Sequence, residues 1–173
     1  SITKEVEVIH NPADAIDVTD VFKIRGLLPD YEIKKRIRIN PLAEKSKPGE
    51  ISYGLSSYGY DFRLGYKFAF SKRPVSDNTE LDPKKTLISQ ICYQETHIDK
   101  SFLLWPKTFV LAESLEYFAL PRDVLGICLG KSTYARCGLI LFMTPLEPEW
   151  EGRLTLEMYN SSDRPIKLYP GEG

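Results

Sequence analysis

Short apolar runs separated by glycine, proline and aspartate recur along most of the chain. They are KFAF at 67–70, TLISQIC at 86–92, SFLLW at 101–105, TFVLAE at 108–113, LEYFALP at 115–121 and VLGICL at 124–129. Strands of this length with regularly spaced turn residues are typical of an antiparallel sandwich or barrel. The pattern therefore predicts a mainly β protein, with exposed polar loops at 45–50 and 71–85.

The N-terminal part of the chain predicts one short helix with an extension in front of it. Asp30 can cap this helix, which should end near Arg38. The extension contains the alternating VEVIH at 6–10, which suits either an added edge strand or a flexible arm. We expect residues 1–29 to form the extension and residues 30–173 to form the main domain.

A β-hairpin is predicted from 139 to 159. An apolar run at 139–143 is followed by a turn-rich stretch and then by an alternating strand at 153–159. One face of that strand carries Leu154, Leu156 and Met158. The other face carries Arg153, Thr155, Glu157 and Tyr159. Glu157 therefore points away from the core, either as a solvated residue or as a catalytic carboxylate.

The segment GKSTYARCG at 130–138 has the composition of a phosphate-binding loop. Between its glycines it carries Lys131, Ser132, Thr133 and Arg136. Cationic and hydroxyl side chains with exposed backbone N–H groups bind polyphosphates. The segment is not a P-loop. That pattern has four residues between its two glycines, whereas only three residues separate Gly126 from Gly130. The segment should form little more than one helical turn before Gly138, and a surface turn with solvated charges is the alternative.

Composition indicates a compact protein with one domain. The chain has 173 residues, 42% of them hydrophobic, which is enough for a sizeable core. Its formal net charge of -1 gives no general attraction to nucleic acid or to anionic membranes. The three cysteines lack paired spacing and no apolar run is long enough to span a membrane, so we expect a cytoplasmic protein.

Four segments together resemble the dCTP deaminases of the dUTPase superfamily. They are SSYGYDFRLG at 56–65, GKSTYARCGL at 130–139, TPLEPEWEG at 144–152 and TLEMYN at 155–160, and their order and spacing also match. The resemblance begins near Asp30 and implies a distorted jelly-roll or barrel-like fold of the dUTPase type in a homotrimer. It also implies hydrolytic deamination of dCTP to dUTP and ammonia, with Mg²⁺ bound through the substrate triphosphate. Relatives continue beyond the position of Gly173 with a further strand and a tail that closes over the triphosphate.

The histidines and cysteines agree with the absence of a catalytic zinc in that family. Zinc deaminases combine an H-x-E segment with P-C-x-x-C. Here His10 is followed by Asn11 and His97 by Ile98, and the cysteines are isolated in apolar runs. We therefore predict no metal site formed by protein ligands.

The resemblance assigns the chemistry to three side chains. Glu157 aligns with the family's catalytic glutamate, which would accept a proton from water and deliver protons to N3 and to the departing amine. Arg136 matches an arginine whose planar guanidinium would orient the water and stabilise charge. Ser132 would support catalysis and contact phosphate, together with Thr133 and Lys131.

The same resemblance places the base and the sugar at the hairpin. Backbone groups near Thr144 would bind the pyrimidine edge, and Trp150 would pack against the deoxyribose or else belong to the core. Glu147 stands where relatives often carry an aspartate, including members that also cleave dUTP. A dUTP diphosphatase, a bifunctional enzyme and a non-catalytic nucleotide-binding module therefore remain as alternatives.

The segment at 56–65 is expected to serve the structure or the edge of the pocket. Asp61 and Arg63 lie two residues apart in it, so they share one strand face. We expect each to form an ion pair, either with the other or with a neighbour.

Overall fold

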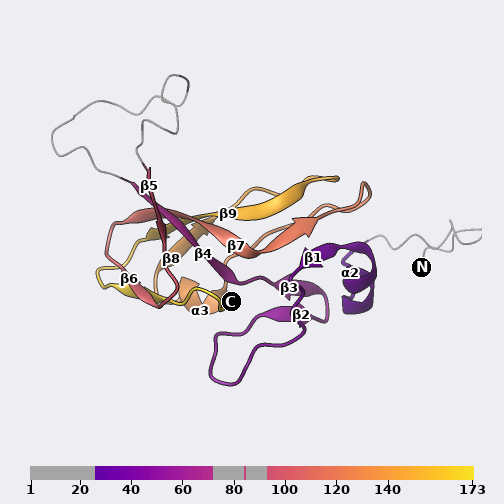
Figure 1. Cartoon of the computed structure of the whole chain (residues 1–173), viewed down its shortest axis with the longest axis horizontal. Helices are drawn as coiled ribbons and strands as arrows, with labels where there is room; N and C mark the ends of the chain where they lie inside the picture. The colour runs from indigo at the N-terminus through magenta and orange to yellow at the C-terminus, as the bar shows by residue number, and fades with distance from the viewer. Residues whose placement is uncertain (1–25, 72–83, 85–92) are drawn as a thin grey trace, which may run out of the picture.

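A six-stranded antiparallel sheet forms the centre of the molecule, as the computed structural model shows (Figure 1). The structure describes residues 26–71, 84 and 93–173. The sheet consists of β1 (Arg38–Asn40), β4 (Leu64–Ser71), β5 (Tyr93–His97), β7 (Phe109–Ala119), β8 (Leu139–Phe142) and β9 (Glu151–Asn160). Their order is β5-β4-β7-β9-β8, and β1 also pairs with β7. The prediction of a mainly β protein is confirmed.

Two small antiparallel sheets and two short helices complete the described fold. β2 (Gly54–Ser56) pairs with β3 (Gly59–Asp61), and β6 (Phe102–Leu104) pairs with β10 (Ile166–Leu168). The helices are α2 (Asp30–Arg36) and α3 (Ser132–Ala135). Within the described residues, the strands do not close into a barrel and no helix is long and apolar enough to cross a membrane.

The predicted helix is confirmed, and its ends lie close to the expected ones, with the cap at Pro29 instead of Asp30. Pro29 holds the capping position, and its carbonyl accepts the N–H groups of Glu32 and Ile33 at 3.0 and 2.9 Å. The carboxylate of Asp30 accepts the N–H of Tyr31 at 2.8 Å within the first turn. The helix ends at Arg36 instead of Arg38, because the next residues pair with β7 as β1.

The runs TFVLAE and LEYFALP form one strand, β7, instead of two. Its pairing with β9 shifts between Glu113 and Tyr117, and Ser114 holds the two strands together there. The Ser114 hydroxyl donates to the carbonyl of Glu116 at 2.7 Å and accepts the N–H of Leu154 at 2.8 Å. The irregularity is thus a bulge with its own hydrogen bonds, which is why the strand continues through it.

The run VLGICL at 124–129 does not form a strand, contrary to the prediction. Its only ladder contact within the described chain is an isolated bridge, in which Gly126 exchanges backbone hydrogen bonds with Leu146 at 2.9 and 2.8 Å. Pro148 lacks an N–H, so the chain opposite Val124 cannot donate the next ladder hydrogen bond on that side of the bridge. The runs at 6–10 and 86–92, and most of the expected loop at 71–85, lie outside the described residues.

The core lies on one face of the large sheet. Buried side chains from β9 pack there with residues of α2, β4, β7 and β10. Leu154, Leu156 and Met158 are only 2%, 3% and 3% exposed, as their alternation predicts. The loop at 45–50 has no regular strand or helix, and most of it is exposed, also as predicted.

One charged group is fully buried beside this core. The Glu116 carboxylate is 0% exposed and accepts hydrogen bonds from Arg63 Nε at 2.6 Å and Arg63 N at 2.9 Å. Tyr60 Oη donates a further hydrogen bond at 3.2 Å. A buried carboxylate is tolerated only when its oxygens are paired. Glu116 therefore fixes the chain between β3 and β4 onto the β7 bulge.

We predict that Glu116→Ala lowers the free energy of unfolding by roughly 3 kcal/mol, because the Arg63 guanidinium loses its partner in a largely buried setting. Urea unfolding followed by circular dichroism would measure the change. Glu113→Ala, on the same strand but only half-buried, is the matched control and should cost much less. Equal losses in the two variants would contradict the importance given to the Glu116 pairings.

Candidate functional site

Glu157 lies in the middle of β9 and points away from the core, as predicted. Its cross-strand neighbours are Leu111 on β7 and Phe142 on β8. The Glu157 side chain is exposed, and Phe142 is 50% exposed beside it. A solvent-accessible carboxylate therefore lies between two apolar side chains. Sequence patterns missed Phe142, because the connection between the paired positions is too long to set the strand register.

The segment at 130–138 forms the predicted single turn of helix. The N–H groups of Ala135 and Arg136 donate to the carbonyls of Lys131 and Ser132 at 2.9 and 3.0 Å. Gly138 ends the turn with a φ of 90°, and a Cβ atom there would come within 2.8 Å of the Ser162 side chain. Only glycine suits both the conformation and the space.

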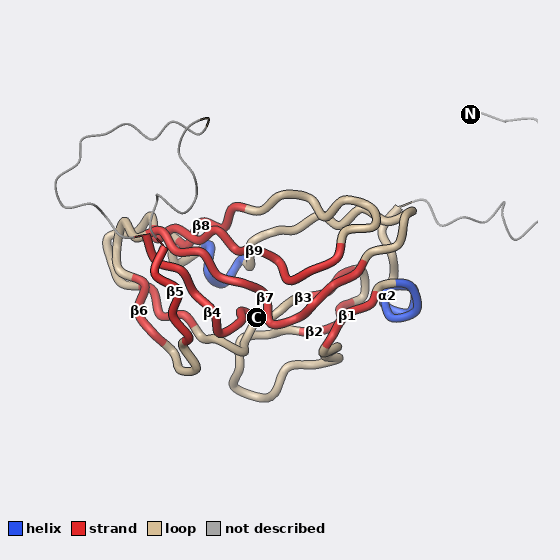
Figure 2. Tube along the Cα trace, turned by 45° about the horizontal axis from the view of Figure 1, so that its top comes forward, coloured by secondary structure: helices blue, strands red, loops and turns tan. Residues whose placement is uncertain are grey.

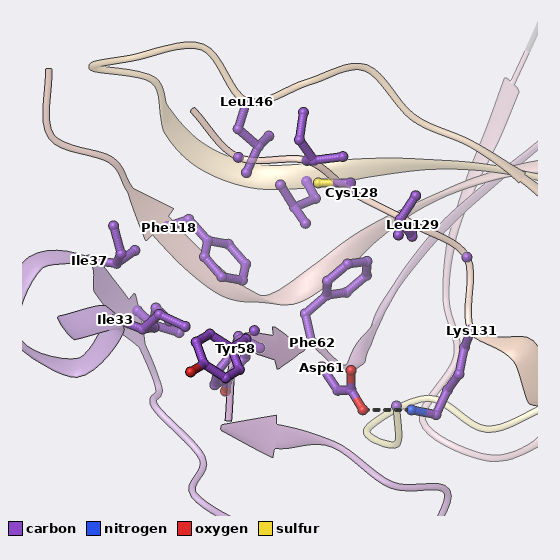
Figure 3. Close-up of a pocket in the computed structure, with 18 of the residues that line it drawn as sticks. Ile33, Ile37, Tyr58, Asp61, Phe62, Phe118, Cys128, Leu129, Lys131 and Leu146 are labelled. Atoms are coloured by element: carbon purple, nitrogen blue, oxygen red, sulfur yellow. Dashed lines mark hydrogen bonds and ion pairs between the residues drawn. The ribbon is translucent and has the colours of Figure 1, made fainter. Parts of the chain in front are cut away.

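This short helix lies beside β8 (Figure 2). Ser132, Thr133 and Arg136 are exposed on it. Lys131 differs, because its Nζ lies 3.0 Å from Asp61 Oδ2 and its side chain is only 20% exposed (Figure 3). The expected ion pairs of Asp61 and Arg63 are thus confirmed with neighbours, since Arg63 pairs with Glu116.

The connection between β8 and β9 carries the other predicted site residues. Thr144 and Glu147 are exposed on it. Trp150 is partly buried and packs against the hydrophobic core. The backbone N–H of Trp150 donates to the carbonyl of Glu147 at 3.0 Å, and the backbone carbonyl of Trp150 accepts the N–H of Leu120 at 3.0 Å. Trp150 thus has a structural role, whereas its expected ligand contact stays a prediction.

A cavity of about 1110 Å³ lies on the inner side of β9, at the edge of the core (Figure 3). Apolar side chains from β9, α2 and the 124–129 segment line most of it. Its polar wall includes Asp61, Lys131, Ser132 and Tyr134. Burial raises the pKa of Tyr134 to about 12, so this phenol is neutral at physiological pH.

The predicted site residues are therefore divided between two regions. Lys131 and Ser132 line the cavity, whereas Glu157 occupies the opposite face of β9. Among residues 26–71, 84 and 93–173, no hydrogen bond or ion pair joins Glu157 to Arg136. Sequence patterns missed Asp61 as the partner of Lys131, because the two residues are 70 positions apart. In that same part of the chain, no three His, Cys, Asp or Glu side chains could hold a metal ion together.

Comparisons with known proteins agree with this architecture. Residues 27–173 match a family model described as dCTP deaminase-like. The chain is 47% identical over 153 residues to the dCTP deaminase of Paramagnetospirillum magneticum, covering 86% of this chain and 80% of that protein. It is 48% identical over 136 residues to the dCTP deaminase of Acidobacterium capsulatum, covering 78% and 72% of the two chains.

A solved structure shares the fold. The 2'-deoxycytidine 5'-triphosphate deaminase from Agrobacterium tumefaciens matches with a TM-score of 0.57 and 16% sequence identity. The match covers 83% of this chain and 44% of that one. The described architecture is a mainly β fold of the dUTPase type. With the family model matched over residues 27–173, the chain belongs to the dCTP deaminase-like family.

The turn before Trp150 contains a strained residue that provides a test of this region. Glu149 has a φ of 66° in a turn closed by the hydrogen bond from Trp150 to Glu147. The third position of such a turn favours glycine. We predict that Glu149→Gly raises the free energy of unfolding by roughly 0.5 kcal/mol, because relief of strain exceeds the added entropy of the unfolded chain. Thermal unfolding would measure it.

Glu149→Ala is the matched control, because alanine removes the same carboxylate but keeps the strained conformation. It should not stabilise the protein. If alanine raised the free energy of unfolding as much as glycine does, the effect would come from loss of the charge and not from backbone conformation.

Proposed function

We propose that the chain catalyses hydrolytic deamination of dCTP to dUTP and ammonia. The observation that carries this proposal is the family membership, with relatives named dCTP deaminase at 43–48% identity. Both parts of the expected chemistry are represented: an exposed carboxylate at Glu157 and a loop with Arg136 and hydroxyl side chains. The proposed reaction uses no catalytic zinc.

In the proposed reaction, water adds to C4 of cytosine while Glu157 accepts its proton. The Glu157 carboxylic acid then delivers this proton to N3. The regenerated carboxylate takes the proton of the new C4 hydroxyl and passes it to the amino group, so that the C4 carbonyl forms while the C4–N bond breaks and ammonia leaves. Support comes from the setting of Glu157, which has no hydrogen bond or ion pair among the described residues. Its apolar neighbours Leu111 and Phe142 would limit the water around it once substrate covers the site.

We propose that the loop binds the triphosphate. Ser132, Thr133 and Arg136 are exposed and able to donate to phosphate oxygens, and Lys131 supplies a further cation. The forked guanidinium of Arg136 would also orient the attacking water near C4. Mg²⁺ would arrive on the triphosphate and neutralise part of its charge. Backbone groups near Thr144 would then bind the cytosine edge, with the sugar toward Trp150.

We further propose a homotrimer in which two subunits complete each site. Within the described part of one chain, no hydrogen bond or ion pair joins Glu157 to Arg136. A neighbouring copy is the simplest source of the arginine that would complete the site around Glu157. Exposed apolar side chains near both regions support a covered interface. They are Leu125, Ile127, Leu129, Ile140 and Phe142.

The first experiment measures ammonia and nucleotide products from Mg²⁺–dCTP. We expect Glu157→Gln to keep dCTP binding but to lose at least about a thousandfold in turnover, because the amide cannot relay protons. Glu151→Gln, on the same face of β9 and paired with Arg38, is the matched control and should remain active.

Near-normal ammonia release by Glu157→Gln would refute the assigned role of this carboxylate. The same product analysis tests the alternative reaction. Formation of dUMP and pyrophosphate, reduced by Glu147→Gln, would identify a bifunctional enzyme. The absence of both products with dCTP binding retained would indicate a binding module.

The second experiment tests the shared site by mixing two inactive variants. Glu157→Gln and Arg136→Ala chains, unfolded together in equal amounts and refolded, should recover roughly one quarter of wild-type activity if one residue comes from each subunit. Averaged over all randomly assembled trimers, including those built from one variant alone, about one site in four combines the intact glutamate with the intact arginine. No recovery in a mixed oligomer verified by mass spectrometry would place both residues within one chain.

A further inference from the structure

The ion pair between Lys131 and Asp61 connects the loop to a separate part of the fold. Lys131 Nζ lies 3.0 Å from Asp61 Oδ2, at the polar end of the cavity (Figure 3). The lysine side chain is 20% exposed, whereas the aspartate side chain is 53% exposed. The lysine expected to bind phosphate therefore already has an anionic partner in the chain.

Asp61 is held in place by the residues around it. It pairs with Gly54 across the β2–β3 hairpin. Tyr60 precedes it and Arg63 follows closely, and both donate hydrogen bonds to the buried carboxylate of Glu116. The Asp61 backbone is thus fixed to the core, while Lys131 reaches it with a long flexible side chain.

Lys131 differs in this respect from the other groups of the loop. Ser132, Thr133 and Arg136 make no side-chain hydrogen bond within the described chain, so an arriving phosphate meets no competing partner there. A phosphate that binds Lys131 must instead compete with Asp61. A partly exposed ion pair is weak, so a ligand with several negative charges can displace the carboxylate.

We infer that Asp61 is a positioning residue that restrains Lys131 before a ligand binds and lowers the affinity for the triphosphate. On binding, the Lys131 ammonium moves from the Asp61 carboxylate to a phosphate oxygen. The inference rests on the proposed function, since it takes a nucleoside triphosphate as the ligand. The recognised chemistry is that of a polyphosphate, so inorganic triphosphate should report the same competition without the base.

The test measures binding of Mg²⁺–dCTP by calorimetry, in chains that also carry Glu157→Gln so that no turnover occurs. Asp61→Asn should tighten binding by roughly two- to fivefold, the range expected for a partly exposed ion pair. Asp61→Glu keeps the carboxylate and should return affinity toward the starting value. Damage to the fold cannot produce this result, because it would weaken binding.

A double-mutant cycle separates the restraint from direct repulsion of the substrate. Lys131→Met should weaken binding, and adding Asp61→Asn to it should change nothing further. Glu44→Gln removes a carboxylate from another surface ion pair, with Lys34, that lies outside the cavity lining. This matched control should leave the affinity unchanged.

Two results of the mutant cycle would overturn the inference. Weaker binding by a folded Asp61→Asn chain would mean that Asp61 supports Lys131 instead of competing for it. Equal tightening in the Lys131→Met chain would mean that Asp61 acts on the substrate directly. Asp61→Ser replaces Asp61→Asn in the cycle if thermal unfolding reveals a damaged fold.

Inorganic triphosphate distinguishes failure of this inference from failure of the proposed function. If the cycle holds for either ligand while the active chain releases no ammonia from dCTP, the restraint stands and the proposed reaction fails. If neither dCTP nor inorganic triphosphate binds, the restraint itself is refuted.

Discussion

The buried carboxylate of Glu116 imposes the constraint on which the arrangement of the site depends. Because water does not reach it, its oxygens must be satisfied by nearby donors, and Arg63 and Tyr60 provide them. These contacts hold the end of β3 against β7. Asp61 lies within the segment so held, which places its carboxylate opposite Lys131. A single buried charge thereby fixes a contact at the candidate phosphate loop.

The same set of alternating side chains faces the core on both sides of the bulge in β7. Between the pairs Glu113–Thr155 and Tyr117–Arg153, β7 advances four residues while β9 advances two. The two extra residues keep the alternation of both strands intact, whereas a single extra residue would invert one of them. The orientation of Glu157 toward solvent is therefore consistent along the whole length of β9.

Local patterns predicted most of what is local in this structure. The alternation of β9 identified its two faces, and the composition of 130–138 identified a single helical turn ended by Gly138. Pairing across the fold was not predictable in this way. The run at 124–129 has the composition of a strand, but within the described chain it forms only an isolated bridge, and Pro148 prevents its extension on the Val124 side. The partners of Glu116 and Lys131 depend on segments brought together only by folding.

One face of β9 stabilises the fold, and the other face carries the residue proposed for the chemistry. Leu154, Leu156 and Met158 contribute packing, whereas Glu157 contributes an exposed carboxylate, so replacing Glu157 should cost little stability. Lys131 does not follow this separation, because it belongs both to the loop and to the contact with Asp61. A substitution of Lys131 would remove the contact with Asp61 and, in the proposed function, the cation offered to phosphate. For this reason, only a cycle with Asp61 can distinguish the two contributions of Lys131.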